Sequence, residues 1–143
     1  MNRAATWKLL LVEDDTDSAE ALMSVFEIND IETVWSSDGA AALQALDSIV
    51  RRGDRPPDLA LLDLNLPATD TVRLSRDVVA HAIGCPVVLT SASSSQVLET
   101  TARQIGAIAA LRKPFSMECL LDILRGRAPS EQDFTLPRSA APR

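Results

Sequence analysis

Residues 59–67 read LALLDLNLP, an apolar run that ends on a carboxylate, Asp63. Three other apolar runs also end on polar residues: 9–15 (LLLVEDD), 87–92 (VVLTSA) and 111–114 (LRKP). Uninterrupted Val, Ile and Leu runs are typical of strands buried on both faces of a parallel sheet. In open α/β sheets, functional residues lie just beyond the carboxyl ends of the strands. We therefore expect the polar residues of these runs to meet at one sheet edge: Glu13, Asp14, Asp63, Thr90 and Lys113.

Strand-like and helix-like segments alternate five times along the chain. Strands are predicted over Lys8–Val12, Ile31–Trp35, Leu59–Leu64, Pro86–Thr90 and Ala107–Leu111. Helices are predicted over Asp17–Asn29, Ala40–Arg51, Thr71–Ala82 and Gln96–Gln104, with Ser93–Ser95 able to cap the fourth, and a fifth begins after Pro114 with Ser116 as its N-cap. Such alternation indicates right-handed βαβ crossovers, and hence an α/β fold with helices on both faces of a parallel sheet.

Composition limits the kinds of partner. The 143 residues suffice for one domain, and because only 3% are aromatic the core must be aliphatic. The net charge of −6 comes without a Lys/Arg stripe, so nucleic acid is not expected as a direct partner. After Gly126 the sequence is rich in Pro, Ser and charges. This predicts a domain over 1–126 followed by a solvated tail over 127–143.

Two cysteines and the N-terminal sequence bear on location. Cys85 and Cys119 have no CxxC partner and are expected in the core, a usage that fits a reducing cytosol. The apolar run after Lys8 is too short for a signal peptide, and no later run approaches transmembrane length. The sequence therefore predicts a cytoplasmic protein without a membrane segment.

The acidic residues predict a metal site. Glu13 and Asp14 follow one strand and Asp63 ends another, so three carboxylates repel one another unless a cation neutralises them. Oxygen ligands without histidine or thiolate favour Mg²⁺, with Mn²⁺ or Ca²⁺ possible, and exclude Zn²⁺. For Asp15 and Asp17 the simpler interpretation is helix capping and compensation of the helix dipole.

The remaining site residues point to phosphoryl chemistry. Asp63 ends a buried strand, where a carboxylate is costly unless paired, and it is a competent nucleophile towards a phosphoryl donor. Thr90 offers a hydroxyl, and Ser91 is small enough to let a main-chain N–H approach a phosphoryl oxygen. Lys113 faces the three acids and is predicted to act as a charge clamp.

This constellation resembles the receiver domain of two-component response regulators, over about Lys8–Arg125. Glu13-Asp14 matches the acidic pair, Asp63 the phospho-acceptor, Thr90 the switch hydroxyl and Lys113-Pro114-Phe115 the Lys-Pro-Phe motif. The resemblance implies a flavodoxin-like doubly wound sheet of order 2-1-3-4-5 and a cis Lys113–Pro114 bond. It also implies that the main-chain carbonyl of Asn65 completes the metal shell.

Two positions depart from the family pattern. Ala110 stands where a switch Tyr or Phe is usual, and Thr71 stands where glycine usually follows Leu-Pro-x-x-Asp. Neither change affects the predicted phosphorylation chemistry. With Ala110, however, the signal cannot propagate through an aromatic ring that turns inward.

The sequence leaves several functions open. A haloacid-dehalogenase-type phosphatase is rejected, because it needs an Asp-x-Asp motif on its first strand. The favoured function is a stand-alone, non-enzymatic receiver that takes a phosphoryl group from a sensor histidine kinase or a histidine phosphotransfer protein and signals to a protein target. The alternatives are a receiver-like adaptor whose partner binding is largely independent of phosphorylation, or the receiver fragment of a longer regulator. A DNA-binding regulator is not favoured, because the roughly seventeen residues after the fifth helix are too few for a helix-turn-helix unit.

Overall fold

The computed structural model describes residues 7–66, 70–81, 85–92 and 95–127. These residues form one parallel sheet of order β2-β1-β3-β4-β5, which confirms the predicted order. The strands are β1 (Trp7–Val12), β2 (Ile31–Ser36), β3 (Leu59–Asp63), β4 (Val87–Ser91) and β5 (Ala109–Arg112). The helices are α1 (Thr16–Ile28), α2 (Gly39–Arg52), α3 (Thr71–His81), α4 (Ser95–Ile105) and α5 (Met117–Leu124).

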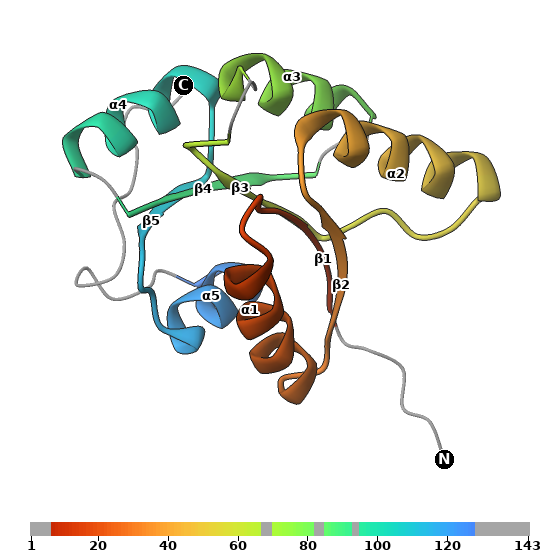
Figure 1. The fold of residues 1–143 in the computed structure, drawn as a ribbon, viewed down its shortest axis with the longest axis horizontal. Helices are drawn as coiled ribbons and strands as arrows, with labels where there is room; N and C mark the ends of the chain where they lie inside the picture. The colour runs from red at the N-terminus through yellow and green to blue at the C-terminus, as the bar shows by residue number, and fades with distance from the viewer. Residues whose placement is uncertain (1–6, 67–69, 82–84, 93–94, 128–143) are drawn as a thin grey trace.

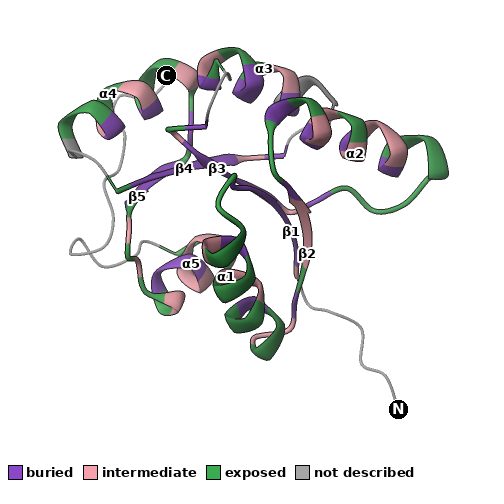
Figure 2. Cartoon of the chain, viewed as in Figure 1, coloured by how far each residue is buried: buried purple, intermediate pink, exposed green. Residues whose placement is uncertain are grey.

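The helices cover both faces of the sheet. Figure 1 shows α2, α3 and α4 on one face and α1 and α5 on the other. Successive strand residues point to opposite faces, so each apolar run supplies two cores. In β1, Leu10 and Val12 pack under α2, α3 and α4, whereas Leu9 and Leu11 pack against α1 and α5. Figure 2 shows the result, with buried strands between helices whose outer faces are exposed. The continuous Leu and Val runs are therefore explained by burial on both sides.

The start of β5 differs from the prediction. We expected this strand from Ala107, but it begins at Ala109. Helix α4 ends at Ile105, and Gly106 adopts the left-handed region with φ of 75°. The main-chain N–H of Ala107 then donates to the Ala102 carbonyl at 2.9 Å. The main-chain N–H of Ala107, which the apolar run had assigned to the strand, thus closes the last turn of α4 instead.

The remaining expectations concern the two cysteines, the cap of α5, membrane-spanning helices and the C-terminal tail. Cys85 and Cys119 are buried, as expected, and burial raises the pKa of Cys85 to about 11. Ser116 caps α5 through its bond from the Cys119 N–H. Among the described residues, no helix is both long and apolar enough to cross a membrane. The expected tail lies outside the described residues except for Arg127, as do Ser93 and Ser94 among the expected capping serines.

Candidate functional site

The carboxyl ends of β1, β3, β4 and β5 bring the predicted residues together. Asp63, the last residue of β3, is in register with Thr90 of β4, and Glu13 directly follows β1. Lys113 directly follows β5, where its main-chain N–H donates to the Ser91 carbonyl at 2.9 Å. The bond that follows it, Lys113–Pro114, is cis as predicted. One sheet edge therefore carries all the polar groups that the sequence pattern had placed there.

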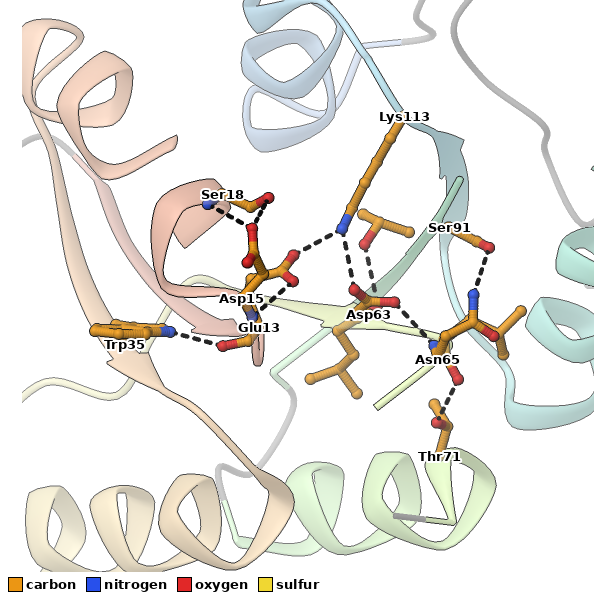
Figure 3. A network of polar contacts seen from close by, with 12 residues as sticks. Glu13, Asp15, Ser18, Trp35, Asp63, Asn65, Thr71, Ser91 and Lys113 are labelled. Atoms are coloured by element: carbon orange, nitrogen blue, oxygen red, sulfur yellow. Dashed lines mark hydrogen bonds and ion pairs between the residues drawn. The ribbon is translucent and has the colours of Figure 1, made fainter. Parts of the chain in front are cut away.

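Lys113 bridges two of the carboxylates. Its Nζ donates to Glu13 Oε1 at 2.7 Å and to Asp63 Oδ2 at 3.0 Å (Figure 3). Burial alone would lower the pKa of Lys113, but the hydrogen bonds and charges of Glu13 and Asp63 raise it above its usual value. The ammonium thus stays charged at neutral pH, and the predicted charge clamp is present in the geometry.

The acidic trio can hold a cation. One oxygen each from Glu13, Asp14 and Asp63 lies within 4.8 Å of the other two. Glu13 and Asp63 are buried, whereas Asp14 is exposed and so open to an ion or its water shell. A donor set made only of carboxylates fits a hard divalent cation such as Mg²⁺.

Asp15 has a different role from the trio. Its carboxylate is the N-cap of α1, accepting the Ser18 N–H at 2.9 Å and the Ser18 hydroxyl at 2.6 Å. The Ser18 hydroxyl is the main reason that the pKa of Asp15 is lowered. The capping interpretation is therefore confirmed for Asp15.

Both oxygens of Asp63 are held. Oδ1 accepts the main-chain N–H of Asn65 at 2.8 Å, and Oδ2 accepts Lys113. The Asn65 side-chain amide donates to Ser91 Oγ at 3.2 Å, which ties the end of β3 to the end of β4. The Thr90 hydroxyl is buried and donates to the Leu62 carbonyl at 3.4 Å, a long bond that is easily exchanged for a better acceptor.

Two contacts of the site were not anticipated. The Trp35 indole N–H donates to the Glu13 carbonyl at 2.9 Å, and the Thr71 hydroxyl donates to the Leu64 carbonyl at 3.1 Å. Thr71 had been noticed as a departure, although not as a contact, and nothing in the pattern around Trp35 pointed to the acidic pair. Ala110 is fully buried in β5 among the residues that pack under α4.

The family assignment follows from comparison with known proteins. The family model of the response regulator receiver domain matches residues 9–125. The chain belongs to this family. It is 31% identical over 126 residues to the DNA-binding response regulator MtrA of Mycobacterium tuberculosis, an alignment that covers 88% of this chain and 52% of MtrA. It is 32% identical over 114 residues to the transcriptional regulatory protein YxdJ of Bacillus subtilis, covering 80% of this chain and 47% of YxdJ.

Solved receiver structures share the fold. The receiver domain of Klebsiella pneumoniae RstA in its BeF3-activated form has a TM-score of 0.67 and 28% identity, covering 84% of this chain and 97% of that one. A CheY-like receiver domain protein from Methanospirillum hungatei has a TM-score of 0.70 at 20% identity, over 84% and 91% of the two chains, and this likeness shows the fold alone. The receiver spans about half the length of the curated relatives it matches.

Proposed function

We propose that this receiver accepts a phosphoryl group on Asp63 from a phosphohistidine donor, with Mg²⁺ bound at the acidic trio. The observation that carries the proposal is the setting of the Asp63 carboxylate. It lies at the sheet edge, held by the Asn65 N–H and the Lys113 ammonium and within 4.8 Å of oxygens of Glu13 and Asp14. The proposed acceptor carboxylate thus lies beside the Lys113 ammonium, which can pair with phosphoryl oxygens, and beside a set of metal ligands.

The transfer forms one bond and breaks another. An oxygen of the Asp63 carboxylate attacks phosphorus, the phosphorus–nitrogen bond of the donor breaks, and the imidazole nitrogen keeps the electron pair and takes a proton from water. Lys113, released from Asp63 Oδ2, pairs with an oxygen of the new acyl phosphate. Mg²⁺, held by Glu13, Asp14, Asp63 and the Asn65 carbonyl, would supply charge neutralisation for the phosphoryl oxygens.

The partners are a sensor histidine kinase or a histidine phosphotransfer protein and a downstream protein target. The domain itself is proposed to be non-enzymatic beyond its own phosphorylation and dephosphorylation. MtrA is named a DNA-binding regulator, but this chain covers only about half of it and carries a net charge of −6. DNA contacts of a longer regulator are therefore proposed to lie outside this domain. The proposal of a cytoplasmic location rests on the use of both cysteines, Cys85 and Cys119, as buried core residues.

Intact mass after incubation with acetyl phosphate and Mg²⁺ tests the proposal. We expect one phosphoryl adduct on the wild type and none on Asp63→Asn. The matched control is Asp54→Asn, since Asp54 is an exposed carboxylate that pairs with Arg52 away from the site. A wild type without adduct would favour the phosphorylation-independent adaptor, and a full adduct on Asp63→Asn would place the acceptor elsewhere.

A further inference from the structure

We infer that Thr71 is a positioning residue for the phospho-acceptor, and this inference rests on the proposed phosphorylation of Asp63. Thr71 is the first residue of α3 and is 6% exposed. Its hydroxyl donates to the Leu64 carbonyl at 3.1 Å (Figure 3). This bond is to the main chain just after β3 and not to the Asp63 carboxylate or the acidic trio, so its effect on the site passes through the main chain.

The path through the main chain is a single peptide group. The Leu64 carbonyl and the Asn65 N–H belong to the same planar peptide unit, and in a trans peptide they point in opposite directions. The Asn65 N–H donates to Asp63 Oδ1 at 2.8 Å. A hydroxyl that holds the carbonyl on the α3 side therefore aims the N–H at the acceptor carboxylate on the other side.

This peptide is the rigid part of the hold on Asp63. The last torsion of an aspartate side chain has broad wells, so the carboxylate plane is set by its hydrogen bonds. Lys113 holds Oδ2 from the end of a long flexible side chain and is proposed to move to the phosphoryl group. The Asn65 N–H remains, and its peptide is held at the Leu64 carbonyl by Thr71. The preceding peptide is held by the Leu64 N–H, which donates to the Thr90 carbonyl at 2.8 Å.

Helix capping does not account for the Thr71 hydroxyl. Asp70 already caps this helix, because its carboxylate accepts the Arg73 N–H at 3.2 Å and its carbonyl accepts the Leu74 N–H at 2.9 Å. The resemblance places glycine at position 71 in most of the family, and glycine has no hydroxyl to hold the carbonyl. The contact is therefore a feature of this chain.

Ser75 provides a matched control. It lies one turn further along α3, is 1% exposed, and donates its hydroxyl to the Thr71 carbonyl at 2.8 Å. Ser75→Ala thus removes a buried hydroxyl of the same helix without touching the peptide at Asp63. Thr71→Val removes the hydroxyl at nearly constant volume, and Thr71→Ser keeps it.

The test measures three quantities in these variants and the wild type: the rate of acyl phosphate formation from acetyl phosphate with Mg²⁺, the ¹H–¹⁵N resonance of the Asn65 amide, and urea unfolding. We expect the rate for Thr71→Val to fall about 3- to 10-fold, as expected for one lost hydrogen bond. Its Asn65 resonance should shift. Thr71→Ser should restore both, and Ser75→Ala should lose stability while its rate and Asn65 resonance match the wild type.

The outcomes separate this inference from the proposed function. If the wild type forms no adduct, the proposed function fails. The Asn65 resonance tests the positioning inference separately: if it is the same in Thr71→Val as in the wild type, the inference is overturned. If the wild type reacts and Thr71→Val reacts equally fast, only the inference fails. A Thr71→Ser protein as slow as Thr71→Val, or an equally slow Ser75→Ala protein, would overturn it too, because the hydroxyl at position 71 would not be the cause.

Discussion

The indole N–H of Trp35 donates to the main-chain carbonyl of Glu13 at 2.9 Å (Figure 3). This carbonyl belongs to the peptide that joins Glu13 to Asp14. The Glu13 N–H donates in turn to the Ser36 carbonyl at 3.1 Å. The end of β2 therefore fixes both main-chain groups of Glu13, and a tryptophan ring is coupled by one bond to the proposed metal ligands.

We predict that Trp35 fluorescence reports metal binding. In a Trp7→Phe background, which leaves Trp35 as the remaining tryptophan, Mg²⁺ should change the emission in a saturable way, because the ion reorients the peptide that accepts the indole bond. Trp7 begins β1, five residues before its carboxyl end, so Trp35→Phe should show no response. Losing the indole bond should also weaken Mg²⁺ binding by about 2- to 10-fold. Calorimetric Mg²⁺ binding without any emission change in the Trp7→Phe protein would contradict the coupling.

Mg²⁺ should also stabilise the fold, because the single ammonium of Lys113 leaves the three carboxylates of the trio with a net negative charge. With a dissociation constant of about 1 mM, about 10 mM Mg²⁺ adds roughly 1.4 kcal/mol to the free energy of unfolding. The melting temperature should rise by about 3–6 °C in thermal unfolding followed by circular dichroism. Asp14→Ala should abolish the rise, whereas Asp17→Ala, in the first turn of α1, should retain it. A full response in Asp14→Ala would locate the ion elsewhere.

Lys113→Met should destabilise the protein at neutral pH by about 1–3 kcal/mol, because two buried carboxylates lose their cation. The folded state raises the pKa of Lys113, so its contribution is complete below the unfolded value of 10.5 and is lost as pH rises through the higher folded value. Urea unfolding at several pH values should therefore show a gap between wild type and variant that is constant to about pH 10 and narrows above it.

Few other groups titrate in the alkaline range in this chain, which has no tyrosine and only one other lysine, Lys8. Cys85 and Cys119 are present in the wild type and the variant alike, so their titration cancels in the gap between the two. Added Mg²⁺ should narrow the gap at neutral pH as well, since the ion takes over the neutralisation of Glu13 and Asp63. A gap that stays constant through pH 11 would show that the ammonium charge is not what Lys113 contributes.

The apolar runs that end on polar side chains were sufficient to predict a parallel sheet and the meeting of the site residues, because burial on two faces demands such runs and parallel strands share a carboxyl edge. The order of the strands was implied by the resemblance to receiver domains, not by the runs themselves. The predicted start of β5 was wrong, because the residues after Gly106 can either cap the helix before them or continue as an apolar strand. With Gly106 in the left-handed region they cap α4, and the strand begins later.

The contacts of Trp35 and Thr71 show where sequence patterns stop being sufficient. Each is a hydrogen bond from a side chain to a main-chain carbonyl on another segment, Glu13 in one case and Leu64 in the other. Such a bond leaves no recognisable pattern in the sequence, since every residue type has a main-chain carbonyl that can accept it. Asp63, the proposed phospho-acceptor, could be found from its pattern, but the hydrogen bonds around it could be found only in the folded chain.

The last prediction concerns how the signal leaves the site. Ala110 is fully buried beneath α4, in the cluster that contains Leu98 and Ala102, so the usual aromatic position has no ring to turn. The surface of α4, β5 and α5 remains the expected partner face by resemblance. Thr90 is the group best able to move, because the bond from its hydroxyl to the Leu62 carbonyl is long, at 3.4 Å. A pull on Thr90 by phosphoryl oxygens would act on the serine-rich sequence that follows it, because serine hydroxyls in general have several alternative local hydrogen-bond partners.

We therefore expect phosphorylation to reorder Ser91–Val97, a range in which Ser93 and Ser94 lie outside the described residues. Hydrogen exchange with and without beryllofluoride should show changed protection there in the wild type, and none in Asp63→Asn, which cannot carry the phosphoryl mimic. Thr90→Val keeps the volume and removes the hydroxyl, so it should bind beryllofluoride yet lose most of the change at Ser91–Val97. If Thr90→Val responds as the wild type does, or if another surface responds while this segment is unchanged, the signal does not pass through the Thr90 hydroxyl and the output face must be sought elsewhere.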